Sequence, residues 1–258
     1  MRYIIAILVA LAPVAVGAGE VVNRTASPGV QQQLRALIAS DNRSAGHKAR
    51  DKYRHPLETL TFFAIDPAST VVEIWPGGQG GWYREIIEPL MAQKGHYIPV
   101  GNGSDFPDNV DFVPYGQVDM VLVFRAHGFM IYDPPAQKYV DALYRMLKPG
   151  GIFGIVDHAG DENVPQDPEG ENGYVNESYF KAMAEKAGFK LLAESGINRN
   201  PKDDKHHPKG VYSLPPSLRG SLPLTEARQK WLAIGESDRF TLKFYKPLGA
   251  ASTTPPKE

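Results

Sequence analysis

From Thr70 onward, apolar residues alternate between short unbroken runs, which are typical of buried strands, and stripes with helical spacing. The runs predict strands over Thr70–Trp75, Tyr97–Val100, Asp119–Phe124, Ile152–Val156, Phe189–Ala193 and Phe240–Tyr245. The stripes predict a helix over Trp82–Met91, which Pro89 should kink or shorten, and two later helices. The first of these two buries Tyr139, Val140, Leu143, Tyr144 and Leu147, and the second Tyr179, Phe180, Met183 and Ala187. Strands that alternate with helices predict an α/β domain with a largely parallel sheet.

The segments outside this alternation complete the predicted organisation. Val30, Leu34, Leu37 and Ile38 have helical spacing, so residues 19–69 are expected to form a helical cap ahead of the α/β domain, which spans 70–247. The last two strands are joined by irregular sequence only, which favours an antiparallel closing pair. Their link, residues 198–238, is far longer than a hairpin needs, and we interpret it as an ordered lid.

The N-terminus has the parts of a secretory signal peptide. Arg2 supplies a positive start, Tyr3–Val16 is almost entirely apolar, and Val16-Gly17-Ala18 offers small residues for cleavage. We therefore expect residues 1–18 to be removed and the protein to be secreted or periplasmic. An uncleaved anchor is the alternative, although the run is shorter than the roughly 20 residues that span a bilayer.

The composition of the chain limits the classes of partner that we expect it to bind. The chain has 28 Lys and Arg against 29 Asp and Glu, interspersed, which implies no polyanionic partner and no nucleic acid. No cysteine is present, so disulfides are excluded. The Pro-rich tail, 248–258, is expected to be disordered. A small-molecule substrate fits these properties, and no stable membrane association is expected after signal cleavage; the oligomeric state cannot be read from the sequence.

A glycine-rich turn directly follows the first predicted strand. The sequence T-V-V-E-I-W-P-G-G-Q-G-G-W-Y runs from Thr70 to Tyr83 and passes from strand to turn to helix. Such a turn lets backbone N–H groups and a helix N-terminus approach a ligand without side-chain obstruction. Many turns contain glycines for steric reasons alone, so the turn by itself is a weak signal.

The turn resembles motif I of the class I S-adenosylmethionine-dependent methyltransferases. The wording E-I-W-P-G-G followed by G-W-Y resembles a narrower group, the predicted secreted bacterial methyltransferases, as do N-P-K-D-D-K-H-H-P-K-G and A-I-G-E-S-D-R later in the chain. The string L-K-P-G-G-I-F-G-I-V resembles the methyltransferase family in general, where it joins a helix to the fifth strand. The resemblance covers roughly Asp51 to Pro247. It implies a Rossmann-like, mostly parallel sheet with a reversed final strand, helices on both faces and a helical N-terminal cap. The implied activity is methyl transfer from S-adenosylmethionine to an unknown small-molecule acceptor.

The resemblance assigns cofactor binding to the strand end and the turn. The residues concerned are Glu73, Trp75, Pro76, Gly77, Gly78, Gly81 and Asn102. Trp75 replaces the usual first glycine, and its indole is expected to narrow the pocket or to stack on the cofactor. The second strand would normally end in an acidic residue that binds the ribose hydroxyls, whereas this chain offers only Asn102 and the later Asp105. The amide of Asn102 would make a weaker, neutral hydrogen bond.

Candidates for catalysis follow two later strands. Arg125 and His127 come after the strand that ends at Phe124, and His158 follows the next one. Ligands of open α/β sheets bind at the carboxyl ends of the strands, and histidine titrates near neutral pH, so either histidine is a candidate base. The alternative is that each only satisfies a backbone carbonyl. Arg54-His55-Pro56 with Glu58 would cap the pocket, as the resemblance suggests, although a helix start explains Pro56 and Glu58 equally well.

Two alternatives remain open. Asp203, Asp204, His206 and His207 suggest a metal site, but they lack the spacing of structural zinc ligands, and we favour a solvated loop without metal. For the whole chain, the alternative to an enzyme is a secreted binding protein with a degenerate methyltransferase fold and no catalysis. Secretion favours that alternative, because the cofactor is made in the cytosol. The retained Glu73 and glycine turn favour the methyltransferase.

Overall fold

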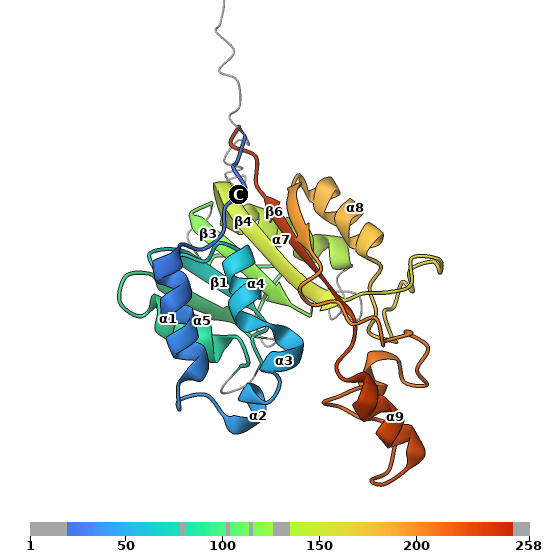
Figure 1. Ribbon diagram of the computed structural model, residues 1–258. Helices are drawn as coiled ribbons and strands as arrows, with labels where there is room; N and C mark the ends of the chain where they lie inside the picture. Colours follow the sequence, from blue (N-terminus) through green and yellow to red (C-terminus); the bar gives the residue numbers. More distant parts are fainter. Residues whose placement is uncertain (1–19, 78–80, 102–103, 114–115, 126–134, 250–258) are drawn as a thin grey trace, which may run out of the picture.

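The computed structural model describes residues 20–77, 81–101, 104–113, 116–125 and 135–249. The predicted signal peptide and most of the predicted tail lie outside these ranges. The described chain forms one six-stranded sheet in the order β2-β1-β3-β4-β6-β5 (Figure 1). Its strands are β1 (Thr70–Ile74), β2 (His96–Val100), β3 (Val118–Phe124), β4 (Leu147–His158), β5 (Lys190–Ser195) and β6 (Arg239–Tyr245).

The strands β2, β1, β3 and β4 are mutually parallel, and β6 is antiparallel to both β4 and β5. The register pairs Ile74 with Val100 and with Val123, so three strand ends lie side by side at one edge of the sheet. The predicted Rossmann-like sheet with a reversed final strand is therefore confirmed.

Helices cover both faces of the sheet. On one face lie α1 (Pro28–Ala39), α4 (Pro56–Phe62) and α5 (Arg84–Met91), and on the other α7 (Ala136–Met146) and α8 (Glu177–Ala187), as Figure 1 shows. Each face has its own core, one centred on the aromatic cluster of Phe153, Phe180, Phe189 and Phe244 and the other on Leu34, Phe63, Ile86 and Ile87. The short helices α2 (Ala45–Lys48) and α3 (Asp51–Arg54) complete the predicted helical cap.

Local sequence explains most element ends. Ser27 caps α1 by accepting a hydrogen bond from the Val30 N–H, and Pro28 occupies the first turn, where no backbone donor is needed. Gly188 ends α8 in the left-handed conformation that glycine adopts without strain. The helix α5 continues through Pro89 to Met91, and it begins at Arg84 rather than at the expected Trp82.

Three expectations about elements were wrong. Tyr179 was placed in the core, but it is 39% exposed, because its position on α8 faces away from the sheet. The strand β4 begins at Leu147, not at Ile152, since Leu147 already pairs with Val118 of β3, ahead of a shift in register. The link 198–238 is not irregular throughout, because it contains the 3-10 helix Gly210–Ser213 and α9 (Glu226–Ile234), which stands away from the sheet in Figure 1.

Candidate functional site

Sheet topology places the candidate site at the carboxyl ends of β1 and β3. The chain leaves β1, passes through α5 to β2 on one side, and later returns as β3 on the other side of β1. The connections therefore diverge between β1 and β3, and a crevice opens outside the carboxyl ends of two such strands. The glycine-rich turn follows β1, and Arg125 follows β3 at the same edge.

Backbone geometry at this edge is unusual. The Trp75 N–H donates to the Val100 carbonyl and the Arg125 N–H to the Val156 carbonyl, both at 2.7 Å, so each residue extends its strand by one bond. Each then turns away in the left-handed region, with φ of 51° at Trp75 and 73° at Arg125. Residues with a side chain adopt this conformation at a cost of about 1–3 kcal/mol, and such strain gathers at functional sites.

Two glycines of the turn are required by its backbone geometry. Gly77 has φ of 95°, which favours glycine, and a Cβ at Gly81 would lie 2.1 Å from the Pro76 carbonyl oxygen. Both glycines therefore have a steric reason to be present, and together they keep this part of the turn as bare backbone. Beyond the turn, the Tyr83 ring stacks on the Phe124 ring of β3, with the ring centroids 3.5 Å apart. This contact joins the start of α5 to the sheet. Gly78 lies outside the described residues.

Glu73 is buried beneath this turn, with 2% of its surface exposed. The Tyr97 hydroxyl donates to Glu73 Oε2 at 2.7 Å. Burial raises the pKa of Glu73 to about 7, although the Tyr97 hydrogen bond and the nearby Arg84 and Arg125 oppose the rise. The carboxyl is thus poised between its neutral and charged forms at neutral pH, a property that is more frequent at functional sites than elsewhere.

Some of the remaining predicted cofactor-binding residues lie within the described ranges of the chain, and others lie outside them. The Trp75 indole is half-buried and packs edge-on against Tyr139 of α7, with the ring centroids 5.6 Å apart. Pro76 continues from Trp75 into the turn. Asn102, the expected ribose ligand, lies outside the described residues, and so does His127.

His158 ends β4, next to the start of β6. Its Nδ1 forms a hydrogen bond with Ser237 Oγ, and its backbone N–H donates to Asp157 Oδ1 at 2.8 Å. The register pairs His158 with Arg239. Because β4 is the neighbour of β3, His158 and Arg125 belong to the same edge of the sheet, as the sequence predicted.

A buried network of arginines at this edge was not predicted. Glu236 accepts hydrogen bonds from Arg50, from Arg54 at 3.1 Å and from Arg239 at 2.9 Å. Burial alone would raise the pKa of Glu236, but these three guanidinium groups outweigh it and lower the pKa to about 2. Burial lowers the pKa of Arg54 to about 9, against the attraction of Glu236.

This network joins the helical cap to the end of the link, since Arg50 precedes α3 and Arg54 ends it, while Glu236 precedes β6. The string A-I-G-E-S-D-R contains both Glu236 and Arg239, and Arg54 belongs to the segment expected to cap the pocket. Those two strings were the only signals in the sequence. Nothing local in them indicates that they meet.

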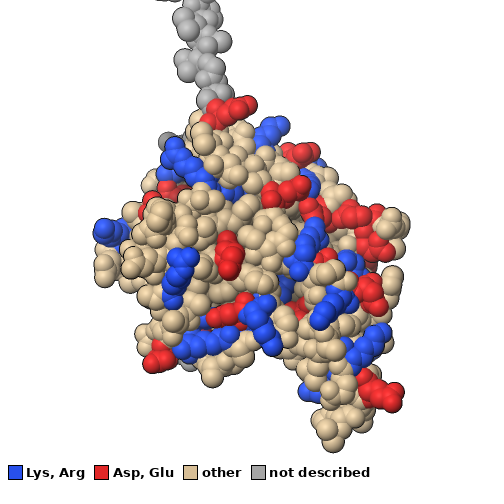
Figure 2. Space-filling view, viewed as in Figure 1, with Lys and Arg blue, Asp and Glu red and all other residues tan. Residues whose placement is uncertain are grey.

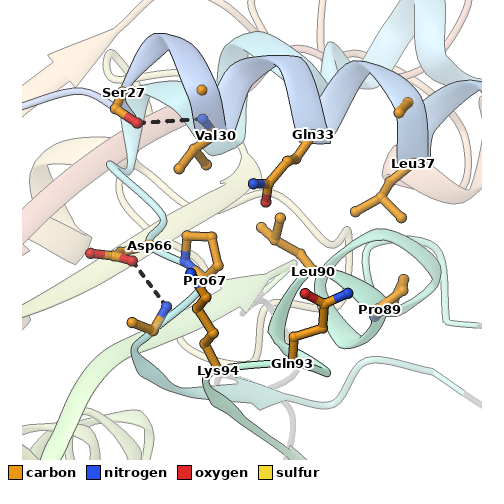
Figure 3. Close-up of a pocket in the computed structure, with 13 residues that line it drawn as sticks. Ser27, Val30, Gln33, Leu37, Asp66, Pro67, Pro89, Leu90, Gln93 and Lys94 are labelled. Atoms are coloured by element: carbon orange, nitrogen blue, oxygen red, sulfur yellow. Dashed lines mark hydrogen bonds between the residues drawn. The ribbon is translucent and has the colours of Figure 1, made fainter.

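A pocket of about 650 Å³ lies elsewhere, between α1, the turn before β1 and the end of α5 (Figure 3). Val30, Leu37 and Leu90 line it together with Gln33 and Gln93. The turn before β1 marks the amino end of that strand, so this groove is at the edge of the sheet opposite the glycine turn. We attribute it to the imperfect packing of α1 on α5.

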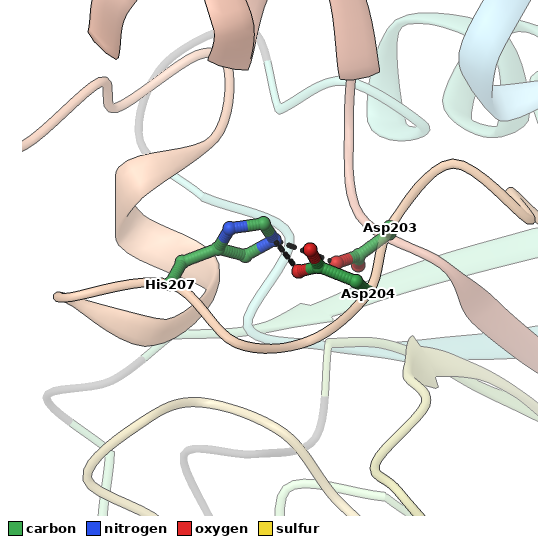
Figure 4. Close-up of side chains that lie close together, drawn as sticks. All are labelled: Asp203, Asp204 and His207. Atoms are coloured by element: carbon green, nitrogen blue, oxygen red, sulfur yellow. Dashed lines mark hydrogen bonds and ion pairs between the residues drawn. The ribbon is translucent and has the colours of Figure 1, made fainter.

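Asp203 and His207 do not form the solvated loop that was expected. Their side chains are 0% and 1% exposed, and His207 Nε2 lies 2.8 Å from Asp203 Oδ1 (Figure 4). Asp203 also accepts hydrogen bonds from the Tyr174 hydroxyl at 2.9 Å and from the N–H groups of Lys205 and Asp238. With Asp204 these groups are close enough to hold an ion, but the carboxylate of Asp203 already has four donors. We interpret it as a structural anchor of the link.

None of the helices in the described part of the chain has the length and apolar character needed to cross a membrane. The predicted signal peptide and its alternative, an uncleaved anchor, fall outside that part.

Comparison with known proteins gives matches among solved structures only. No protein-family model matches the chain, and no curated protein matches it. A SAM-dependent methyltransferase from Aquifex aeolicus is 16% identical, with a TM-score of 0.47 over 65% of this chain and 93% of its own. Geranyl diphosphate C-methyltransferase from Streptomyces coelicolor A3(2), solved with Mg²⁺, geranyl diphosphate and S-adenosyl-L-homocysteine, is 11% identical, with a TM-score of 0.47 over 91% and 93%. The [4+2]-cyclase SpnF is 15% identical, with a TM-score of 0.47 over 88% and 100%. The fold assignment of this chain rests on its own sheet order.

Proposed function

We propose that this protein is a methyltransferase that binds S-adenosylmethionine at the carboxyl ends of β1 and β3 and methylates a small molecule. The observation that carries the proposal is the position of the glycine turn, which follows β1 at the point where the connections of the sheet diverge. The motif in this turn is the one that resembles the methyltransferases. The proposal includes membership of the secreted bacterial family, and hence a periplasmic or secreted location.

The residues at the site fit such a cofactor. The Pro76–Gly81 turn and the start of α5 would present backbone N–H groups to it, since glycine leaves the backbone bare there. Glu73 would accept a hydrogen bond from it in its charged form, and Trp75 would wall one side. The bound cofactor would supply an activated methyl group on a sulfonium.

The chain's own contribution to the reaction is positioning. Methyl transfer needs the donor carbon and the acceptor atom in line within about 3–3.5 Å, and fixed geometry supplies most of the rate. His158, at the end of β4, would take a proton from the acceptor, and Ser237, which is hydrogen-bonded to Nδ1, would orient its ring. The catalytic assignments of Arg125, His127 and His158 stay predictions.

Calorimetry of the mature chain with S-adenosylmethionine and with S-adenosylhomocysteine tests this proposal. We expect saturable binding of both. Gly81→Ala should weaken binding at least about tenfold, because the new Cβ would lie 2.1 Å from the Pro76 carbonyl oxygen and force the turn to shift. Gly46→Ala is the matched control, since its Cβ would meet nothing within 4 Å.

Absence of heat with either ligand at millimolar concentration would contradict the proposal and favour the secreted binding protein. Equal affinity of the two glycine variants would place the ligand away from the turn.

A further inference from the structure

Positive charge exceeds negative charge along the carboxyl edge beside the glycine turn. The four arginines there are Arg50, Arg54, Arg125 and Arg239, and the two carboxylates that interact with them most closely are Glu236 and Asp157. Glu73 also interacts with Arg125, but with a pKa of about 7 it is only partly charged at neutral pH. The edge therefore keeps an excess of more than one positive charge.

The excess is concentrated at Arg125. Glu236 neutralises the charge of its hydrogen-bonded partners Arg54 and Arg239 in part, and both arginines are almost fully buried. Arg125, the residue after β3, is instead exposed to solvent, and its backbone N–H donates to β4, the strand that pairs with Arg239 of β6. Surrounding protein and the repulsion of Arg50 lower the pKa of Arg125, so its guanidinium lies close to the cluster.

A donor in this cluster lacks a partner. Nη2 of Arg50 is buried and has no hydrogen-bond acceptor among the described residues, while Nε of the same side chain binds Glu236. Buried donors are nearly always satisfied, so an unsatisfied one next to an exposed like charge indicates a missing acceptor. An anion between Arg50 and Arg125 would relieve the repulsion and satisfy the donor together.

We propose that Arg125 and Arg50 together bind a carboxylate or phosphate group of the methyl acceptor. The substrate class is then a small anion. The inference rests on the proposed function, because it assumes that the acceptor lies beside the cofactor at the carboxyl edge. Arginine suits this role, since its planar guanidinium binds two oxygens of such a group at once.

Titration of the mature chain with inorganic phosphate tests this anion site, with and without saturating S-adenosylhomocysteine. We expect saturable phosphate binding in both conditions. Arg125→Gln should weaken it roughly 10- to 100-fold, because one charged hydrogen-bonding partner is lost. Arg125→Lys should restore part of the affinity. Arg35→Gln, which removes an exposed arginine on α1, should have no effect.

Three results would overturn the inference. The first is no phosphate binding, and the second is equal binding by wild type and Arg125→Gln. The third is exclusion of phosphate by S-adenosylhomocysteine, which would assign the two arginines to the carboxylate of the cofactor itself. Failure of S-adenosylhomocysteine to bind, with phosphate binding intact, would instead count against the proposed function alone.

Discussion

The buried carboxyl of Glu73 lowers the stability of the folded protein when it is charged. A carboxyl that is buried with one hydroxyl partner is less stable in its charged form than the same group in water. Its pKa of about 7 in the folded protein lies above its ordinary value of 4.5. The folded chain therefore holds the proton more tightly than the unfolded chain does, and stability falls as pH rises between these two values. A residue kept under such conditions is typical of a binding site.

The first prediction concerns this residue. Glu73→Gln keeps the shape of the side chain but cannot ionise, so it should raise the free energy of unfolding by about 2–3 kcal/mol at pH 8. At pH 4 the Glu73 carboxyl is protonated and therefore as neutral as the glutamine amide. The variant and the wild type should then have the same free energy of unfolding. Denaturant unfolding at the two pH values measures the difference.

Glu185→Gln, an exposed change on α8, serves as the control for removing one negative charge. A stabilisation by Glu73→Gln that is the same at pH 4 and pH 8 would refute the assigned pKa. The same variant should weaken the binding of S-adenosylmethionine, because the charged hydrogen-bond acceptor is lost.

At the scale of elements, the link between β5 and β6 is held by Asp203. Its carboxylate binds Tyr174, His207 and the backbone of Asp238, so it fastens the link both to the loop before α8 and to the start of β6. The lid interpretation predicts that this anchor limits the motion of residues 198–238. Within this link, α9 adds one buried side chain, Trp231.

The second prediction follows from this anchor. Asp203→Asn puts an amide where four donors converge, and it should speed amide hydrogen exchange in residues 198–238 by roughly 10- to 100-fold. Exchange in β1 and β3 should stay unchanged. Asp204→Asn is the control, because its side chain is largely exposed. Equal amide exchange rates in residues 198–238 of the wild type and both variants would show that Asp203 does not hold the link.

Elements differ in how far the sequence predicts them. The strands β1, β3 and β4 were found because each is buried on both faces and reads as a continuous apolar run. The helix α9 was missed because it buries Trp231 alone and so has no apolar stripe. The network around Glu236 was missed for a different reason: Arg50 lies 186 positions away in the chain, and only the fold brings the two together.

The site was predictable in part. Glycines after a strand indicated the turn, and the residues after β3 and β4 placed Arg125 and His158 at the same edge. Their chemistry was not predictable, because burial decides the pKa of Glu73 and burial depends on the packing of α5. The roles of Gly78, Asn102 and His127 stay predictions.

At the scale of the molecule, Figure 2 shows Lys and Arg interspersed with Asp and Glu over one face, without a large area of one sign. This distribution agrees with the near balance of 28 basic and 29 acidic residues. The positive excess inferred above is therefore local to the carboxyl edge. A small anionic ligand fits such a site better than an extended polyanion does.

The third prediction concerns the location of the protein. If residues 1–18 are a signal peptide, mass spectrometry of protein from the periplasm or the medium should find a chain that begins at Gly19 or within about two residues of it. Blocking signal peptidase should lead to accumulation of the longer form. An intact Met1 on protein from the cytosol would contradict secretion.

The central claim is that S-adenosylmethionine binds where the connections of the sheet diverge. A crystal structure of the mature chain with S-adenosylhomocysteine tests this claim most directly. We predict electron density for the ligand outside the carboxyl ends of β1 and β3, against the Pro76–Gly81 turn and within reach of Glu73. Density in the groove between α1 and α5, or an ordered empty turn at saturating ligand, would contradict it.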